Sequence, residues 1–310
     1  MSASFSSALG AALEAAGAQH YPQSTLYVVA TPIGNLADIS LRALHVLGLA
    51  DRVACEDTRH TQALLRAFGI DKSGTQLLAV HQHNEAQAAH AVVDLLRAGL
   101  RVAYVSDAGT PGVSDPGARL VAQVRAQGLR VVPLPGASSV TTVLSAAGLV
   151  QDGDGGTGFV FAGFLSSKAT ERTHAVQVLA SQVKATVMLE APHRIEALAL
   201  ALATLGERLV TVGRELTKQF EEIATVRADA LSAWLAADAN RLRGEFVLVL
   251  HPMRSTTEVA QDDRVLKLLL EHLPLKTAVK LAADISGEPR NALYQRALAL
   301  KAPSSDDALD

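Results

Sequence analysis

Short apolar runs alternate with amphipathic stretches along the first half of the chain. Each run ends in small or turn-forming residues, and apolar positions at helical spacing follow, which is typical of a strand, a loop and a helix in turn. Repeated units of this kind predict a parallel sheet covered by helices on both faces. The strands are expected at 26–30, 52–57, 76–80, 101–105 and 130–134, and the helices at 41–49, 59–68, about 88–99, 118–127 and 140–147.

Residues 151–158 are nearly all glycine and aspartate, which predicts a linker between two domains. The alternation resumes after this segment. Only a few residues separate the runs 209–216 and 222–227, which favours an antiparallel hairpin and therefore a mixed second sheet. Strands are expected at 159–164, 186–190, 209–215, 222–226 and 245–250, and helices at 168–180, 193–205 and 228–239.

The pattern changes after about residue 252, where a polar stretch at 255–260 precedes three amphipathic segments at 264–273, 275–285 and 289–300. Their short connections are helix-turn-helix-like. Residues 274–301 carry a local charge of +3, so a helical cap on the body and a nucleic-acid-binding unit both remain open. We therefore expect a flexible extension (1–23), two α/β domains (24–150 and 158–252) and a helical extension (262–301).

Composition narrows the choice of compartment and partner. The 310 residues carry a net charge of −3, so the chain does not hold nucleic acid by bulk positive charge. The single cysteine, Cys55, forms no internal disulfide and suits a reducing compartment. No apolar run reaches the length of a membrane span, and the first twenty residues lack the basic start of a signal peptide. A cytoplasmic protein is expected.

The loop after the fourth strand, VSDAGTPGVSDPG at 105–117, consists almost entirely of small and turn-forming residues. Its backbone can come close to a ligand, and it lies at the carboxyl edge of the sheet, where α/β proteins bind their ligands. The loop at 31–40 has the same character, and neither loop carries a dinucleotide or Walker fingerprint. A cofactor cradle and an ordinary strand-to-helix turn both remain open, and Asp107 either contacts a ligand or caps its own loop.

Seven motifs occur in a fixed order: ATPIGNLADIS (30–40), CEDTR (55–59), VSDAGTPGVSDPG (105–117), LPGASS (134–139), EAPHR (190–194), GRELTKQFEE (213–222) and GEFVLVL (244–250). Together they resemble the tetrapyrrole methylase superfamily. Within it they are similar to the RsmI type, which acts on ribosomal RNA and has DAGTP where small-molecule enzymes have a GDP-type loop. Residues 274–300 resemble the helical extension of that type, so the resemblance covers about 25–301.

This resemblance implies S-adenosyl-L-methionine (SAM) as methyl donor, bound in a cleft between the two α/β domains. It implies a cytidine of 16S ribosomal RNA near the decoding centre as substrate, methylated on its ribose 2′-hydroxyl in the small subunit, and it implies a homodimer. Matched position by position, the residues that contact the cofactor are Pro32, Ile33, Asp107, Ala108, Gly109, Gly112, Ser138, Ser139, Glu190 and Leu216.

The acceptor side is predicted from polar residues at loop ends. A ribose hydroxyl is a poor nucleophile, so a base or a cation beside it would help, and Glu190 and Lys218 are the candidate catalytic groups. Arg194 is the alternative, purely structural partner for Glu190, and Lys218 is alternatively an ordinary surface residue. The candidate substrate-binding residues are Asp57, His81, Glu85, Arg194, Arg214, Lys276, Lys280 and Arg290.

The same sequence also has to be compared with a metal site and with two other functions. His81 and His83 lie near Glu85 without a third ligand at fixed spacing, so we expect no metal. A small-molecule methylase of the tetrapyrrole type is one alternative, which the basic tail and the missing GDP-type loop argue against. A ribosome-binding protein without catalytic activity is the other.

Overall fold

The computed structural model describes residues 5–81, 84–115, 117–149, 158–253 and 264–301. The described residues up to 253 form one compact unit, and residues 264–301 belong to a second. No helix among these residues is both long and apolar enough to cross a bilayer. The predicted linker at 151–158 and the polar stretch at 255–260 fall almost wholly outside the described residues, so the predicted domain boundaries stay predictions.

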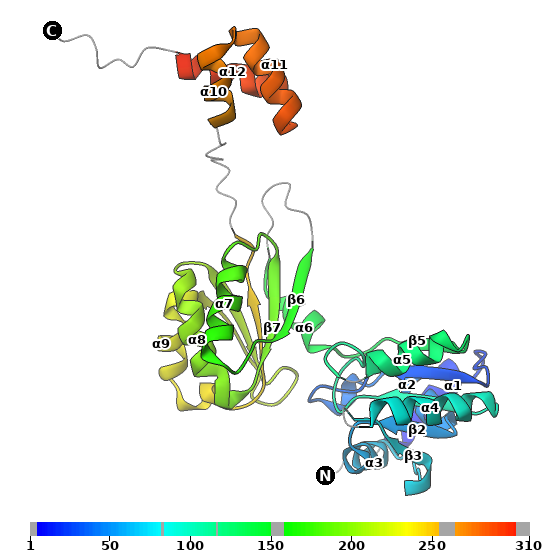
Figure 1. Ribbon diagram of the computed structural model, residues 1–310. Helices are drawn as coiled ribbons and strands as arrows, with labels where there is room; N and C mark the ends of the chain where they lie inside the picture. Colours follow the sequence, from blue (N-terminus) through cyan, green and yellow to red (C-terminus); the bar gives the residue numbers. More distant parts are fainter. Residues whose placement is uncertain (1–4, 82–83, 116, 150–157, 254–263, 302–310) are drawn as a thin grey trace, which may run out of the picture. The chain divides into compact units, whose positions relative to one another are not determined.

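The first sheet is parallel throughout, as predicted, with strand order β3-β2-β4-β1-β5 (Figure 1). The fully buried positions of β4 explain why its sequence is a continuous apolar run, because helices cover both faces of a parallel sheet. The strands are β1 (Thr25–Val29), β2 (Arg52–Cys55), β3 (Leu77–Ala79), β4 (Arg101–Val105) and β5 (Arg130–Leu134).

Alternate strand residues divide the core of this sheet into two clusters, one on each face. Helices α1 (Ser6–Ala16), α2 (Leu41–Leu49) and α3 (Thr58–Ala67) pack on one face, and α4 (Glu85–Arg97) and α5 (Gly117–Ala126) on the other. The segment predicted as a flexible extension contains α1, which packs against α2. Ala12 and Ala16 of α1 are buried, because small residues on one helix face allow close packing.

The second sheet has the order β6-β7-β10-β8-β9 and is mixed, as predicted. Strands β6 and β7 are parallel, the other neighbours are antiparallel, and β8–β9 is the predicted hairpin. The strands of the second sheet are β6 (Phe159–Phe164), β7 (Ala185–Glu190), β8 (Leu209–Arg214), β9 (Glu222–Arg227) and β10 (Phe246–Leu250).

Cys55, which lies in β2 of the first sheet, is buried, and this burial raises its thiol pKa to about 11.

Helices α7 (Ala169–Ala180), α8 (Ile195–Leu202) and α9 (Leu231–Ala236) pack on one face of the second sheet, and α6 (Ser139–Ala146) packs on the other. The helices predicted at 193–205 and 228–239 are each divided into α and 3-10 segments. The Asp238 side chain accepts a hydrogen bond from the Asn240 N–H and starts a separate turn. The 3-10 turns are η1 (Leu36–Asp38), η2 (Gly74–Gln76), η3 (Pro192–Arg194), η4 (Ala203–Leu205), η5 (Ala228–Ala230) and η6 (Ala239–Leu242).

The second unit consists of α10 (Arg264–His272), α11 (Leu275–Ser286) and α12 (Arg290–Lys301). Gly287 ends α11 in the left-handed conformation with φ 74°, a common glycine cap, and its N–H donates to the Ala283 carbonyl. Buried residues from all three helices, among them Leu266, Val279 and Leu293, form its core. The predicted three-helix extension is therefore present.

Candidate active site

The loops after β1, β4 and β5 are joined to one another. Thr31 and Gly109 exchange two backbone hydrogen bonds of 2.9 and 3.0 Å, which tie the first loop to the second. The Thr110 hydroxyl donates to the Ala137 carbonyl at 2.9 Å, which ties the second loop to the third. The sequence predicted two loops of one character, at 31–40 and 105–117, and the structure joins them to each other and to the loop after β5.

The middle loop depends on glycine. Gly109 has φ +81° and Gly112 has φ +84°, in the region that side-chain-bearing residues rarely adopt. A Cβ at Gly109 would also lie 3.3 Å from the Ile33 side chain. Ala108 and Gly112 are exposed, so this loop presents accessible backbone, as a cofactor cradle requires.

Acidic groups lie directly beside this loop. The Asp107 carboxylate accepts a 3.2 Å hydrogen bond from the Asp57 N–H, so it caps the neighbouring loop rather than its own. The Asp107 N–H in turn faces the Glu56 carboxylate at 3.4 Å. Burial raises the pKa of Glu56, and the nearby carboxylates of Asp107 and Asp115 raise it further. Three carboxylates, those of Glu56, Asp107 and Asp115, therefore lie close together at this edge of the sheet.

Asp115 was not among the predicted site residues, yet it shapes the end of the loop. Its carboxylate accepts hydrogen bonds from the Tyr104 hydroxyl (2.9 Å), the Gly112 N–H (2.7 Å) and the Gly117 N–H (2.8 Å). Burial raises the pKa of Tyr104, and Asp115 adds to the effect, so the phenol stays a neutral donor. An aspartate two residues before the helix start was the available signal, because aspartate commonly bonds to its own following backbone.

A strained turn after β8 lies against the first loop. Glu215 (φ +50°) and Thr217 (φ +66°) are left-handed although neither is glycine, a strain typical of functional sites. A Cβ at Gly34 would lie 2.4 Å from Lys218 Cγ and 3.0 Å from Thr217 Oγ1. The turn after β8 therefore contacts the loop after β1, where the resemblance expects the cofactor.

Several of the predicted cofactor residues lie near this contact. Ile33 packs with Leu216 in an apolar cluster that also contains two valines of α6. Pro32 is buried, and the half-buried Ser138 and Ser139 stand at the start of α6. The Ser138 hydroxyl accepts no helix-capping hydrogen bond from a backbone N–H of the described residues, so it is available to a ligand.

Lys218 is held by two carboxylates. Its Nζ lies 2.8 Å from Glu215 and 2.9 Å from Glu245. Burial lowers the pKa of Lys218, but the hydrogen bonds to the two carboxylates outweigh burial and raise it. The ammonium therefore stays protonated near neutral pH. It can stabilise negative charge or donate a hydrogen bond, but it cannot act as a base there.

Glu190 is buried and paired with Arg194 at 3.1 Å, the alternative partner that the sequence offered. Arg194 also donates to the Leu165 carbonyl. Because strand residues alternate between faces, Glu190 shares the face of Met188, which packs under α7–α9. Leu189, by contrast, packs with the α6 cluster. The geometry favours the structural pairing over a contact with cofactor, and the predicted roles of Glu190 stay predictions.

The predicted substrate-binding residues are spread over several places. Asp57 caps α3 by accepting from two backbone N–H groups, which lower its carboxyl pKa. The buried Arg214 donates to the Phe220 carbonyl at 3.0 Å and faces Glu222 at 3.4 Å, which favours a structural role. His81 is exposed at the end of β3.

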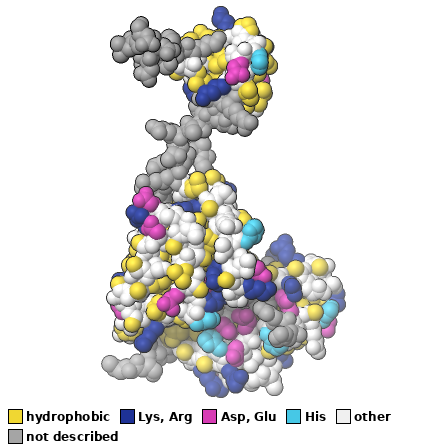
Figure 2. Space-filling model, turned by 60° about the vertical axis from the view of Figure 1, so that its left-hand side comes forward, with side chains coloured by type: hydrophobic (Ala, Val, Ile, Leu, Met, Phe, Trp, Pro, Cys, Tyr) yellow, Lys and Arg dark blue, Asp and Glu magenta, His cyan; other side chains and the backbone are white. Residues whose placement is uncertain are grey.

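On the helical unit, Lys276, Lys280 and Arg290 are exposed, and Arg290 lies 3.1 Å from Asp284. Figure 2 shows hydrophobic as well as basic side chains on its surface. His83 lies outside the described residues, and among those described no group of three His, Cys, Asp or Glu side chains is arranged to hold a metal ion.

Comparisons with known proteins identify the family to which this chain belongs. The family model of tetrapyrrole (corrin/porphyrin) methylases matches residues 25–232, and the chain belongs to this family. Within it, the chain belongs to the RsmI type, since the model of the RsmI C-terminal HTH domain matches residues 256–301.

Curated relatives support the same assignment. The chain is 47% identical over 275 residues to ribosomal RNA small subunit methyltransferase I of Vibrio cholerae, covering 87% of this chain and 93% of the relative. It is 45% identical to the protein of the same name from Escherichia coli O157:H7, covering 89% and 95%. Among solved structures, uroporphyrin-III C-methyltransferase from Thermus thermophilus has TM-score 0.53 and 22% identity, covering 74% of this chain and 94% of that one, a likeness of fold.

Proposed function

We propose that this protein is a SAM-dependent methyltransferase of the small ribosomal subunit. Its reaction is transfer of a methyl group to the ribose 2′-hydroxyl of a cytidine in 16S ribosomal RNA, near the decoding centre. The observation that carries the proposal is identity of about 45% to relatives named ribosomal RNA small subunit methyltransferase I, over nearly the whole length of both chains. The basic helical unit, which matches the RsmI C-terminal domain, supports a nucleic-acid substrate.

The loop residues suit SAM. Bound SAM supplies a methyl group on a positively charged sulfur atom. The carboxylates of Glu56, Asp107 and Asp115 give the edge of the first sheet a negative potential that favours such a cation. The left-handed glycines Gly109 and Gly112 keep side chains out of the loop, so its backbone can contact the nucleoside and amino-acid ends.

The chain contributes mainly by positioning. Methyl transfer requires the acceptor oxygen, the methyl carbon and the sulfur in line, and fixing such a geometry is a large part of catalysis. The junction of three loops and the strained turn at Glu215–Thr217 provide fixed surfaces for this. Of the two candidate catalytic groups, the geometry favours Lys218, because its turn contacts Gly34 whereas the Glu190 carboxylate is paired with Arg194.

Lys218 is suited to the acceptor side as a cation. Two carboxylates hold its ammonium in place, and its raised pKa keeps it charged. A fixed ammonium can bind an RNA phosphate, or stabilise negative charge on the 2′-oxygen while its proton passes to solvent water. The proposal also includes a cytoplasmic homodimer, which the family resemblance suggests.

The test is methyl transfer from labelled SAM to small ribosomal subunits taken from cells that lack this protein. The expected result is one methylated cytidine, located by digestion and mass spectrometry, with the label on ribose. In a parallel assay that offers a precorrin-like compound in place of the subunits, label on that compound would favour the small-molecule alternative. Tight binding to the subunit without transfer would favour a ribosome-binding protein.

A further inference from the structure

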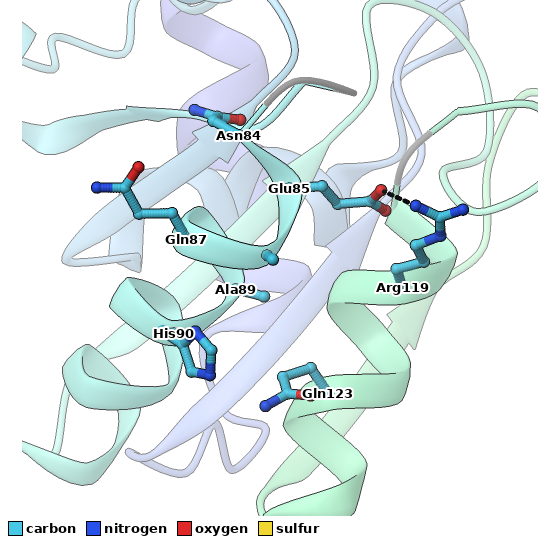
Figure 3. Close-up of a pocket in the computed structure, with 8 residues that line it drawn as sticks. Asn84, Glu85, Gln87, Ala89, His90, Arg119 and Gln123 are labelled. Atoms are coloured by element: carbon cyan, nitrogen blue, oxygen red, sulfur yellow. Dashed lines mark hydrogen bonds and ion pairs between the residues drawn. The ribbon is translucent and has the colours of Figure 1, made fainter.

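A polar groove of about 500 Å³ lies between the first turns of α4 and α5 (Figure 3). Both helices follow strands of the first sheet, so their N-terminal turns lie at the carboxyl edge of that sheet. Helix α5 starts directly after the loop that Asp115 fixes, so the groove adjoins the cofactor loop. Its polar lining residues are Asn84, Glu85, Gln87, His90, Arg119 and Gln123.

Glu85 is the unusual residue of this groove. Its side chain is 8% exposed, and Oε2 lies 3.1 Å from Arg119 Nη1. No described residue donates a hydrogen bond to the buried Oε1. A buried carboxylate oxygen without a donor is costly, and native proteins rarely leave one unexplained. A ligand that brings an N–H group would satisfy it.

Arg119 is suited to admit such a ligand. Its side chain is 84% exposed, and an ion pair with so exposed a partner adds little to stability. The guanidinium can therefore swing outward and uncover Glu85. Figure 3 shows Arg119 and Glu85 pointing toward each other from the two helices, with His90 and Gln123 further along the same helices. Guanidinium and imidazole are both flat groups on which an unstacked RNA base can stack.

We propose that this groove binds a nucleobase of the RNA substrate that carries an exocyclic amino group, at a position near the methylated nucleotide. The amine donates to Glu85 Oε1, as the 4-amino group of cytosine does to acidic side chains in other complexes. Arg119 binds the backbone phosphate or stacks on the base. Uracil is rejected, because its 4-oxo group would face a carboxylate. This inference rests on the proposed function and adds base selectivity to it.

The test uses small subunits reconstituted with transcribed RNA in which single nucleotides near the methylated position are replaced by uridine. For the unmodified protein, one replacement should raise KM about tenfold. Glu85→Gln should abolish that difference or favour uridine, because an amide can donate to the 4-oxo group. Arg119→Ala should raise KM for every RNA. Arg125→Ala removes an exposed arginine of α5 outside the groove and should match the unmodified protein.

The inference is overturned by an unmodified protein indifferent to every replacement, or by a Glu85→Gln protein that keeps the full discrimination. Both leave methyl transfer itself intact, whereas failure of the proposed function would appear as no transfer to any subunit. SAM affinity and thermal unfolding are measured for each variant to show that the fold is kept. If Glu85→Gln unfolds, Arg119→Ala decides, since an unchanged KM for it also overturns the inference.

Discussion

Replacing Gly109 by alanine tests whether the joined loops bind SAM. Gly109 has φ +81°, and an alanine forced into that region costs about 1–2 kcal/mol. The new Cβ would also lie 3.3 Å from Ile33 Cγ2, so Ile33 must shift by a few tenths of an ångström. Ile33 packs with Leu216, and Gly109 bonds to Thr31, so the shift reaches both sides of the predicted cofactor site.

Gly99→Ala is the matched control. Gly99 has φ +87°, but apart from Gly99 itself and its two chain neighbours, no atom of the described residues lies within 4 Å of the added Cβ. The left-handed backbone should therefore cost both variants about 1–2 kcal/mol of stability, which lowers Tm by about 2–8 °C for a unit of this size. Only Gly109→Ala should weaken SAM binding, by about tenfold, or about 1.4 kcal/mol.

The assays are calorimetric titration with SAM and thermal unfolding of each variant. Equal SAM affinity for Gly109→Ala and the unmodified protein would refute the location of the site. Equal weakening by Gly99→Ala would show that general backbone strain, not the loop junction, controls binding.

Three further changes follow from the ion pairs and from the helical unit. Lys218→Met removes an ammonium group whose pKa in the folded protein is raised above its ordinary 10.5. The stability that this group contributes is therefore complete below pH 10.5, and it disappears as the pH rises through the folded pKa. The variant and the unmodified protein should thus differ in unfolding free energy by a constant amount from about pH 7 to 9, and this difference should shrink above pH 10.5. A difference that shrank below pH 9 would contradict the raised pKa. Arg194→Ala leaves the Glu190 carboxylate buried without its ion-pair partner, and denaturant unfolding should show a loss of about 3–5 kcal/mol of stability. Adding Glu190→Gln to this variant should recover part of the loss. No recovery would mean that the two side chains are not coupled. Truncation after Met253 should keep SAM affinity and weaken sedimentation with small subunits at least tenfold, about 1.4 kcal/mol; undiminished sedimentation would mean that the helical unit is only a cap.

The elements that the sequence predicted well are those specified by local pattern. The helix at 41–49 has its predicted bounds, because Ser40 is a favoured cap and the apolar spacing is regular. The hairpin of β8 and β9 was readable from the short gap between two strand-like runs. The parallel first sheet followed from the repeated alternation of strand and helix.

Contacts between distant residues were not readable from the sequence. The bond between Thr31 and Gly109 joins two loops that β2, β3, β4 and their helices separate along the chain, and only folding of the sheet brings them together. Likewise Lys218 has many acidic residues nearby in sequence, but the structure selects Glu215 and Glu245. Small-residue composition indicated two of the loops that the structure joins, while side-chain pairing depended on register between strands.

The order of strands in the first sheet also constrains how the chain is made. Strand β1 (Thr25–Val29) has both of its neighbours far downstream, in β4 (Arg101–Val105) and β5 (Arg130–Leu134). Contacts that close such long loops form slowly. During synthesis the apolar β1 therefore leaves the ribosome well before either partner exists, and the first domain cannot complete its sheet until residue 134 has emerged. Over the synthesis of about a hundred residues, β1 therefore lacks both of its pairing partners, and an unpaired apolar strand favours aggregation.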